Sequence, residues 1–156
     1  MNKERNLVVA CDGANKIEEY TTNGVLVREI CLKADVSSPW HALQLSSGHY
    51  VVSRDTSPGV VSVVGVDGQV VRSYKGRMNH PRRLVVTRKD DILAADASNN
   101  RILSINSSLS SAQELTLSAD GRIHRPRGLY LDESRGRLYV GEHSSVPSLL
   151  VFDVTL

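Results

Sequence analysis

The stretch Pro39-Trp-His-Ala-Leu-Gln-Leu-Ser-Ser-Gly-His-Tyr-Val-Val-Ser-Arg-Asp55 has two diverged copies further along this chain of 156 residues. They are Pro81-Arg-Arg-Leu-Val-Val-Thr-Arg-Lys-Asp-Asp-Ile-Leu-Ala-Ala-Asp96 and Pro126-Arg-Gly-Leu-Tyr-Leu-Asp-Glu-Ser-Arg-Gly-Arg-Leu-Tyr-Val-Gly-Glu142. The opening prolines are 42 and then 45 residues apart. A truncated copy, Leu7-Val-Val-Ala-Cys-Asp12, comes first and aligns with Ile92-Leu-Ala-Ala-Asp96. Periods of about 40–50 residues are typical of propeller blades, kelch units and HEAT arrays.

Each copy has the pattern of β-strands rather than helices. Short apolar runs rich in Val, Ile, Leu and Tyr alternate with turn residues, and no long window has a period of 3.6 residues. This pattern predicts 14 strands grouped as three, four, four and three, which is an all-β propeller portion of about 3.5 four-stranded blades. The hairpin turns that separate the strands have the Gly, Asn or Asp that such turns need. They are Asn23-Gly24, Ser47-Gly48, Asp67-Gly68, Asp90-Asp91, Asp120-Gly121 and Arg135-Gly136.

The predicted blades cover residues 6–38 in part, 39–80, 81–125 and 126–156 in part. The first and last blades would expose apolar faces, because a blade cannot bury both of its faces alone. Two outcomes follow from this. Either the sequence is part of a larger propeller, which we favour because it starts inside a blade, or two chains associate to close a ring.

One turn resembles a known family. The stretch Ala94-Ala-Asp96-Ala-Ser-Asn99-Asn100-Arg101-Ile102 resembles the NHL repeat, and Asp12-Gly-Ala-Asn15-Lys16-Ile17 matches it in part. The resemblance implies a six-bladed ring, and the chain is similar to the C-terminal part of tripartite-motif-type proteins, which are ubiquitin-ligase scaffolds. The chain has no RING spacing of Cys and His, so ligase chemistry would lie outside it. Within the turn, Asp96 and Arg101 are expected to pair, with Asn99 and Asn100 supplying the left-handed conformation that it requires.

Charge and composition exclude several classes of protein. The 19 basic and 17 acidic residues leave a net charge of +2, which forces neither a nucleic-acid nor a membrane role. No apolar run reaches the ~18 residues of a membrane span, and Leu7–Cys11 is shorter than the apolar region of a signal peptide. Cys11 and Cys31 are too far apart in sequence for a metal knuckle, and we expect both to be reduced and buried. The chain is therefore expected to be soluble and cytoplasmic.

The loops that enter the inner strands are basic. We expect Arg82, Arg83, Arg125 and Arg127 to converge near the propeller axis, because they begin neighbouring inner strands. Trp40 is expected to pack between blades, although it could instead stack on a base. This basic face would bind a protein partner; the alternative is single-stranded RNA. Its candidate residues are Trp40, His41, Lys75, Arg77, His80, Arg82, Arg83, Arg122, His124, Arg125 and Arg127.

A metal-dependent propeller hydrolase or lyase is the third reading. His41, His80 and His124 recur once per blade, but each has a different offset from its proline, so they do not define one tetrahedral site. The chain also has no nucleophile elbow, zinc-binding helix motif or phosphate loop. We therefore expect a binding or scaffold module without catalytic residues, metal or cofactor.

Overall fold

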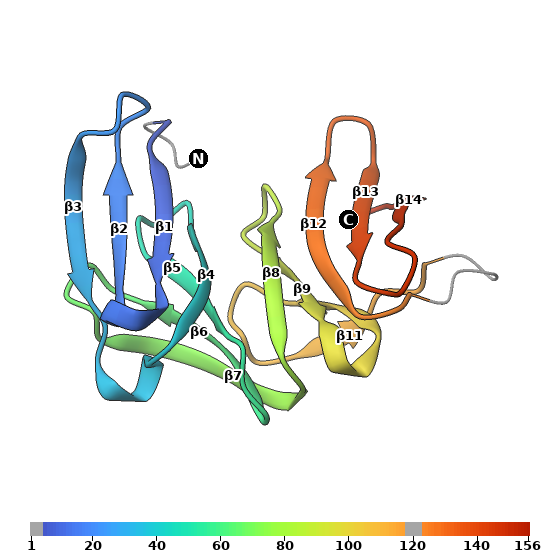
Figure 1. Ribbon diagram of the computed structural model, residues 1–156, viewed down its shortest axis with the longest axis horizontal. Coiled ribbons are helices and arrows are strands. Elements are labelled where there is room, and N and C mark those ends of the chain that lie inside the picture. Colours follow the sequence, from blue (N-terminus) through green and yellow to red (C-terminus); the bar gives the residue numbers. More distant parts are fainter. Residues whose placement is uncertain (1–4, 118–122) are drawn as a thin grey trace.

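The computed structural model describes residues 5–117 and 123–156, in which fourteen strands form four antiparallel sheets (Figure 1). The first sheet contains β1 (Leu7–Cys11), β2 (Lys16–Tyr20) and β3 (Leu26–Cys31). The second contains β4 (Pro39–Gln44), β5 (Tyr50–Arg54), β6 (Gly59–Val64) and β7 (Val70–Met78). The third contains β8 (Pro81–Val86), β9 (Ile92–Asp96), β10 (Arg101–Ile105) and β11 (Ala112–Glu114). The fourth contains β12 (Pro126–Asp132), β13 (Arg137–Glu142) and β14 (Leu149–Asp153). The all-β prediction and the grouping of the strands are confirmed.

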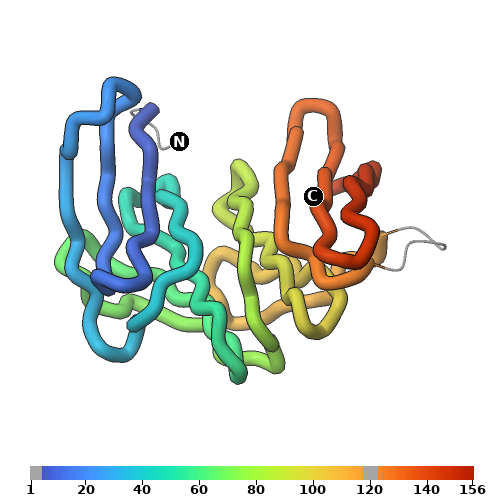
Figure 2. The backbone as a smooth tube through the Cα atoms, viewed as in Figure 1, coloured from blue at the N-terminus to red at the C-terminus, as the bar shows by residue number. Residues whose placement is uncertain are grey.

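Apolar layers between neighbouring sheets hold the fold together. Ile17 packs with Tyr50 between the first two sheets, and each of these side chains is fully buried. Equivalent layers join the second sheet to the third and the third to the fourth. Burying one such side chain stabilises the fold by about 1.5–3 kcal/mol. Within the described residues no strand pairing or shared core joins the first sheet to the fourth, so the arc of sheets is open (Figure 2).

The inner strands β4, β8 and β12 all start in the same way. The residue before each opening proline has a positive φ: 58° at Ser38, 55° at His80 and 43° at Arg125. The amide of that residue donates a hydrogen bond to a turn of the preceding sheet, for example from Ser38 to Asn15 Oδ1 at 3.0 Å and from Arg125 to Asn100 Oδ1 at 2.8 Å. These bonds fix where each inner strand enters, and so they position the side chains at its start.

In the part of the chain that the structure describes, the first sheet has no inner strand. Its turn η1 (Asp12–Ala14) ends at the left-handed residue Asn15, just as η3 (Ala97–Asn99) in the third sheet ends at Asn100. β1 is therefore equivalent to β9, the second strand of a blade. This geometry corrects the predicted alignment by one residue, because Cys11, and not Asp12, occupies the position of Asp96 at the end of the strand.

The outward faces of the two end sheets differ in chemistry. Strand register places Cys11, Lys16 and Glu18 on the outward face of the first sheet, and Lys16 Nζ lies 2.7 Å from Glu18 Oε1. In the third sheet the position of Glu18 is taken by Leu103, which is buried against the second sheet. The outward face of the fourth sheet carries an apolar patch of Tyr130, Tyr139, Leu149 and Val151, of which Tyr130 is 64% and Leu149 is 66% exposed. The ion pair of Arg137 with Asp153 lies at one end of the same face.

The predicted turn residues take the conformations that hairpins need. Gly24, Gly48, Gly68 and Gly136 have φ between 60° and 86°, and Asp90 replaces glycine in its turn with φ 63°. The Asp120-Gly121 turn lies outside the described residues. Gly68 is required for a second reason, because a Cβ there would lie 1.9 Å from the carbonyl oxygen of Cys31.

Both cysteines are free thiols, but the predicted burial is wrong. Cys11 is half-buried and Cys31 is exposed, because no neighbouring sheet covers the outward face on which they lie. Among the described residues, no helix has the length and hydropathy that crossing a bilayer would need.

Candidate functional site

The inner edges of the sheets surround a groove. Residues of β1, β4, β8 and β12 line this groove, which has a volume of about 950 Å³. The starts of β4 and β8 contribute Trp40, His41 and Arg83, while Asp90 and Glu133 lie beyond the other ends of the inner strands. We call this cavity the central groove. Its size is typical of a ligand cleft.

Trp40 lies at the entrance to the groove, where it is 47% exposed. It is not packed between blades as predicted. Instead, the guanidinium carbon of Arg82 lies 4.6 Å from the centre of the indole ring. Arg82 also forms an ion pair of 2.8 Å with Asp55 Oδ2, and the second oxygen of Asp55 lies 2.9 Å from His80 Nδ1. Asp55 therefore holds two of the predicted basic residues in place, and the arginine holds the indole ring.

Arginines from two adjacent blades converge beside this assembly. Burial lowers the pKa of Arg127, and the charges of Arg82 and Arg125 lower it further, whereas Asp55 opposes the shift. Arg82 and Arg125 thus each lie within electrostatic range of Arg127. Among the described residues, no carboxylate forms an ion pair with Arg83, Arg125 or Arg127. We call Arg82, Arg83, Arg125 and Arg127 the basic rim.

His41 is held as a neutral side chain. Its Nδ1 atom accepts a hydrogen bond of 3.2 Å from the amide of Leu84, on the adjacent inner strand. Burial, together with the charge of Arg83, lowers the pKa of His41 to about 4. The hydrogen bond requires Nδ1 to be unprotonated, so the proton of the neutral ring is on Nε2. His41 therefore links two inner strands and is not charged at neutral pH.

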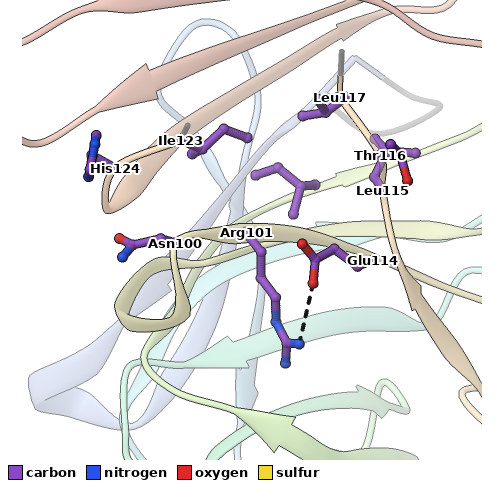
Figure 3. Close-up of a pocket in the computed structure, with 9 residues that line it drawn as sticks. Asn100, Arg101, Glu114, Leu115, Thr116, Leu117, Ile123 and His124 are labelled. Atoms are coloured by element: carbon purple, nitrogen blue, oxygen red, sulfur yellow. Dashed lines mark ion pairs between the residues drawn. The ribbon is translucent and has the colours of Figure 1, made fainter. Parts of the chain in front are cut away.

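The remaining predicted residues do not join the rim. Lys75 and Arg77 lie on β7, the outermost strand of the second sheet, and are exposed there. Their expected place in the loop that enters the inner strand β8 is wrong, because β7 continues to Met78. His124 lines a separate pocket of about 400 Å³, formed by β10, the end of β11 and residues that connect the third sheet to the fourth; Figure 3 shows it with Arg101 paired to Glu114. Arg122 lies outside the described residues.

The predicted turn pair is confirmed as a structural element. Arg101 Nε lies 2.8 Å from Asp96 Oδ2, and Asp96 is completely buried. The same carboxylate accepts hydrogen bonds from the backbone amide of Asn79 at 2.7 Å and from the side-chain Nδ2 of Asn99 at 2.9 Å. Asn100 alone takes the left-handed conformation, because Asn99 belongs to the preceding turn. Asp96 has no access to the groove, so its role is to hold the blade together.

The histidines that repeat along the chain do not form a metal site. His41 and His80 each bind a partner within the protein, and His124 faces another pocket. Across residues 5–117 and 123–156, no three His, Cys, Asp or Glu side chains are grouped as metal ligands would be.

Two elements of the site were not predicted from the sequence. Asp55, the counter-ion of the rim, closes the first quoted copy, and its position beside a basic strand start was a usable signal. The contribution of β1 to the groove had no such signal, because it depends on the missing inner strand of the first sheet.

The fold, but not the sequence, matches known proteins. No protein-family model and no curated protein matches the chain. A protein of unknown function from Bacteroides caccae matches with a TM-score of 0.78 and 18% identity, over 97% of this chain and 61% of that one. A gluconolactonase from Xanthomonas campestris matches with a TM-score of 0.74 and 17% identity, over 97% and 55%. The WD40 β-propeller domain of Doa1 matches with a TM-score of 0.65 and 18% identity, over 91% and 45%.

These likenesses identify the four sheets as a β-propeller portion. The chain spans 45–61% of the length of the three structures. Because the neighbours include both a gluconolactonase and a WD40 domain, these likenesses show the fold and not the role of the chain.

Proposed function

We propose that this propeller portion is a non-catalytic binding module that holds an acidic segment of a protein partner at its basic rim. The observation that carries the proposal is the contact of Arg82 with the exposed indole ring of Trp40, together with the closeness of Arg82 and Arg125 to Arg127. Arginine is suited to this task, because its planar guanidinium binds carboxylates in a bidentate geometry. The Asp55 ion pair orients Arg82 in advance, which reduces the entropy that a partner must overcome on binding.

The rest of the groove favours a peptide over a nucleic acid. Leu43, Val85 and Leu129 are among the apolar residues that line it, and they suit the apolar side chains of a peptide. Asp90 and Glu133 line the far end and would repel the phosphates that every nucleotide of an RNA carries along the groove, whereas a peptide can place its acidic residues at the rim alone. Single-stranded RNA remains a second candidate for one reason, which is that the exposed ring of Trp40 could stack on a base.

The wider context of the proposal comes from the turn between Asp96 and Arg101, whose residues are similar to an NHL repeat. A tripartite-motif-like scaffold in the cytoplasm, with any ubiquitin-ligase domain outside this chain, would use such a module to select its partner. A non-catalytic role fits the engagement of His41 and His80 with partners inside the protein.

Fluorescence polarisation tests the proposal with two probes, a labelled peptide of four Glu-Leu repeats and a labelled uridine decamer. The double variant Arg83→Ala/Arg127→Ala should bind the peptide at least about tenfold more weakly than the wild type, with a smaller dependence on salt. The control is Arg135→Ala/Arg137→Ala, which removes the same charge from the turn between β12 and β13 and from the start of β13, outside the rim. It should leave the affinity for the peptide unchanged. Equal losses in both variants, or no binding of the peptide at low salt, would refute a specific acidic site. Tighter binding of the decamer, lost in Trp40→Ala, would replace the peptide with RNA.

A further inference from the structure

Among residues 5–117 and 123–156, β1 pairs with β2 alone, so these residues supply no partner strand for the edge of β1 that faces the central groove. Four consecutive residues, Leu7 to Ala10, line the groove. Side chains of a strand alternate between its two faces, so four residues in succession border a cavity only where the backbone edge itself faces it. Leu7 is 45% and Val9 is 41% exposed at this edge.

The three other sheets show what belongs beside such an edge. In each of them an inner strand pairs antiparallel with the strand equivalent to β1. The opening proline of that inner strand lies opposite the last residue of the second strand, as Pro39 lies opposite Arg54 and Pro81 opposite Asp96. The fourth residue, Leu84 in the third sheet, lies opposite Ala94 and is buried.

The inner strands also share a sequence pattern. Each begins with proline, has a buried Ala or Leu at its fourth position and has an apolar residue at its fifth. The fourth residues are Ala42, Leu84 and Leu129, and the fifth are Leu43, Val85 and Tyr130. The pattern can be written Pro-x-x-aliphatic-apolar.

From these observations we propose that the open edge of β1 is a binding site for an extended peptide segment of the pattern Pro-x-x-aliphatic-apolar, which adds to the first sheet as its inner strand. Strand addition is an established mode of peptide recognition, in which main-chain hydrogen bonds supply affinity and alternate side chains supply specificity. By equivalence with the other sheets, the proline of the segment lies opposite Cys11 and its fourth residue lies opposite Val9. The site does not depend on the basic rim, so its ligand need not be acidic.

The probe is the uncharged stretch Ser38–Ser46 as a labelled synthetic peptide, Ser-Pro-Trp-His-Ala-Leu-Gln-Leu-Ser, added to the intact chain. We expect saturable binding with a Kd of about 100 µM or tighter, changed less than about twofold between low and high salt. Each inner strand has a β-bulge just after its proline, so two further peptides carry N-methyl groups on alternate residues beyond that point, one on Ala42 and Gln44 and the other on Leu43 and Leu45. Only one of them should lose binding, because the amides of a strand point alternately to opposite edges and only one set faces β1.

Cys11 provides a direct test of the register. A peptide with cysteine in place of proline, its sulfur activated as a 2-thiopyridyl disulfide, should form a mixed disulfide with Cys11 at least about tenfold faster than with the exposed Cys31, because directly opposed strand residues are within disulfide distance. The Cys11 thiolate attacks the peptide sulfur and displaces 2-thiopyridone, whose absorbance follows the reaction. The reaction is run at pH 9, since burial and the neighbouring Glu18 raise the pKa of the Cys11 thiol. The matched controls are the Cys11→Ser chain and a peptide with cysteine at the fourth position, and both should lose the preference.

The proposal is overturned by any of three results: no saturable binding up to about 1 mM, retention of binding by both N-methylated peptides, or equal labelling of the two cysteines. If a second copy of the chain occupies the edge instead, the peptide will not bind at chain concentrations at which the chain is associated. It will bind once the chain is diluted enough to dissociate. That result assigns the site to the segment carried by the second copy. Loss of binding in the Arg83→Ala/Arg127→Ala variant would show that the peptide uses the rim and not the edge.

Discussion

Replacement of Asp96 by alanine should destabilise the propeller portion without affecting the groove. The side chain is fully buried and accepts hydrogen bonds from Asn79, Asn99 and Arg101. Asn99 and Arg101 both retain the carbonyl oxygen of Arg77 as a partner after the substitution, whereas the backbone amide of Asn79 has no second acceptor among the described residues. One buried donor without a partner costs about 1–3 kcal/mol, and the two weakened donors add about 1 kcal/mol. We therefore expect a loss of about 2–4 kcal/mol in the free energy of unfolding.

Urea denaturation followed by circular dichroism measures this loss as a shift in midpoint at an unchanged m value. Asp96→Asn should cost about half as much, because its amide oxygen can still accept from Asn79 while its NH₂ group faces the donors of Asn99 and Arg101. The control is Asp153→Ala, whose 92% exposed side chain lies 3.7 Å from Arg137 and should have no measurable effect. An Asp96→Ala variant as stable as the wild type would refute the structural role of this carboxylate.

Three further predictions concern pH and association. Hydrogen bonds from Lys16 and then Tyr20 lower the pKa of Glu18 to about 2, so its contribution to stability should be present above pH ~4.5 and be lost as the pH falls toward 2; acid titration of Glu18→Gln should be flatter in that window. Burial lowers the pKa of His41 to about 4 from its usual 6.5, so the unfolded chain binds the proton more tightly than the folded chain. The free energy of unfolding should therefore rise with pH between these two values, and this rise should be absent in unfolding curves of His41→Phe. The wild type should associate reversibly in analytical ultracentrifugation through the apolar face of the fourth sheet, and Leu149→Lys/Val151→Lys should remain monomeric; equal sedimentation of the two would contradict this.

The fold could be predicted because single residues at fixed positions mark each copy of the repeat. Backbone geometry requires proline at the start of each inner strand and glycine at the turn positions with positive φ. These residues can be read directly from the sequence. The Asp96–Arg101 pair was predictable for the same reason, since both residues belong to one short turn. The grouping of the strands then follows from counting these signals.

The site was only partly predictable, because it depends on where strands end and on which side chains meet between blades. Lys75 and Arg77 look like loop residues in the sequence, but Met78 is buried and keeps them on β7. The contact of Arg82 with Trp40 joins two inner strands that lie about one repeat apart, and no local pattern encodes it. Cys11 shows a third limit, since a shift of one residue in the alignment moves a side chain to the opposite face of its sheet.

The unlike outward faces of the two end sheets limit how many copies can assemble. A stack that was apolar at both ends could join head to tail without closing and would form fibres. Here the fourth sheet exposes the apolar Leu149 and Val151, whereas the first sheet carries the ion pair of Lys16 with Glu18. An apolar surface cannot replace the hydration of these two charges. The fourth sheet therefore meets its own equivalent in a second copy more favourably than it meets the first sheet. Such an isologous contact is satisfied by two copies, so association through this face should stop at a dimer.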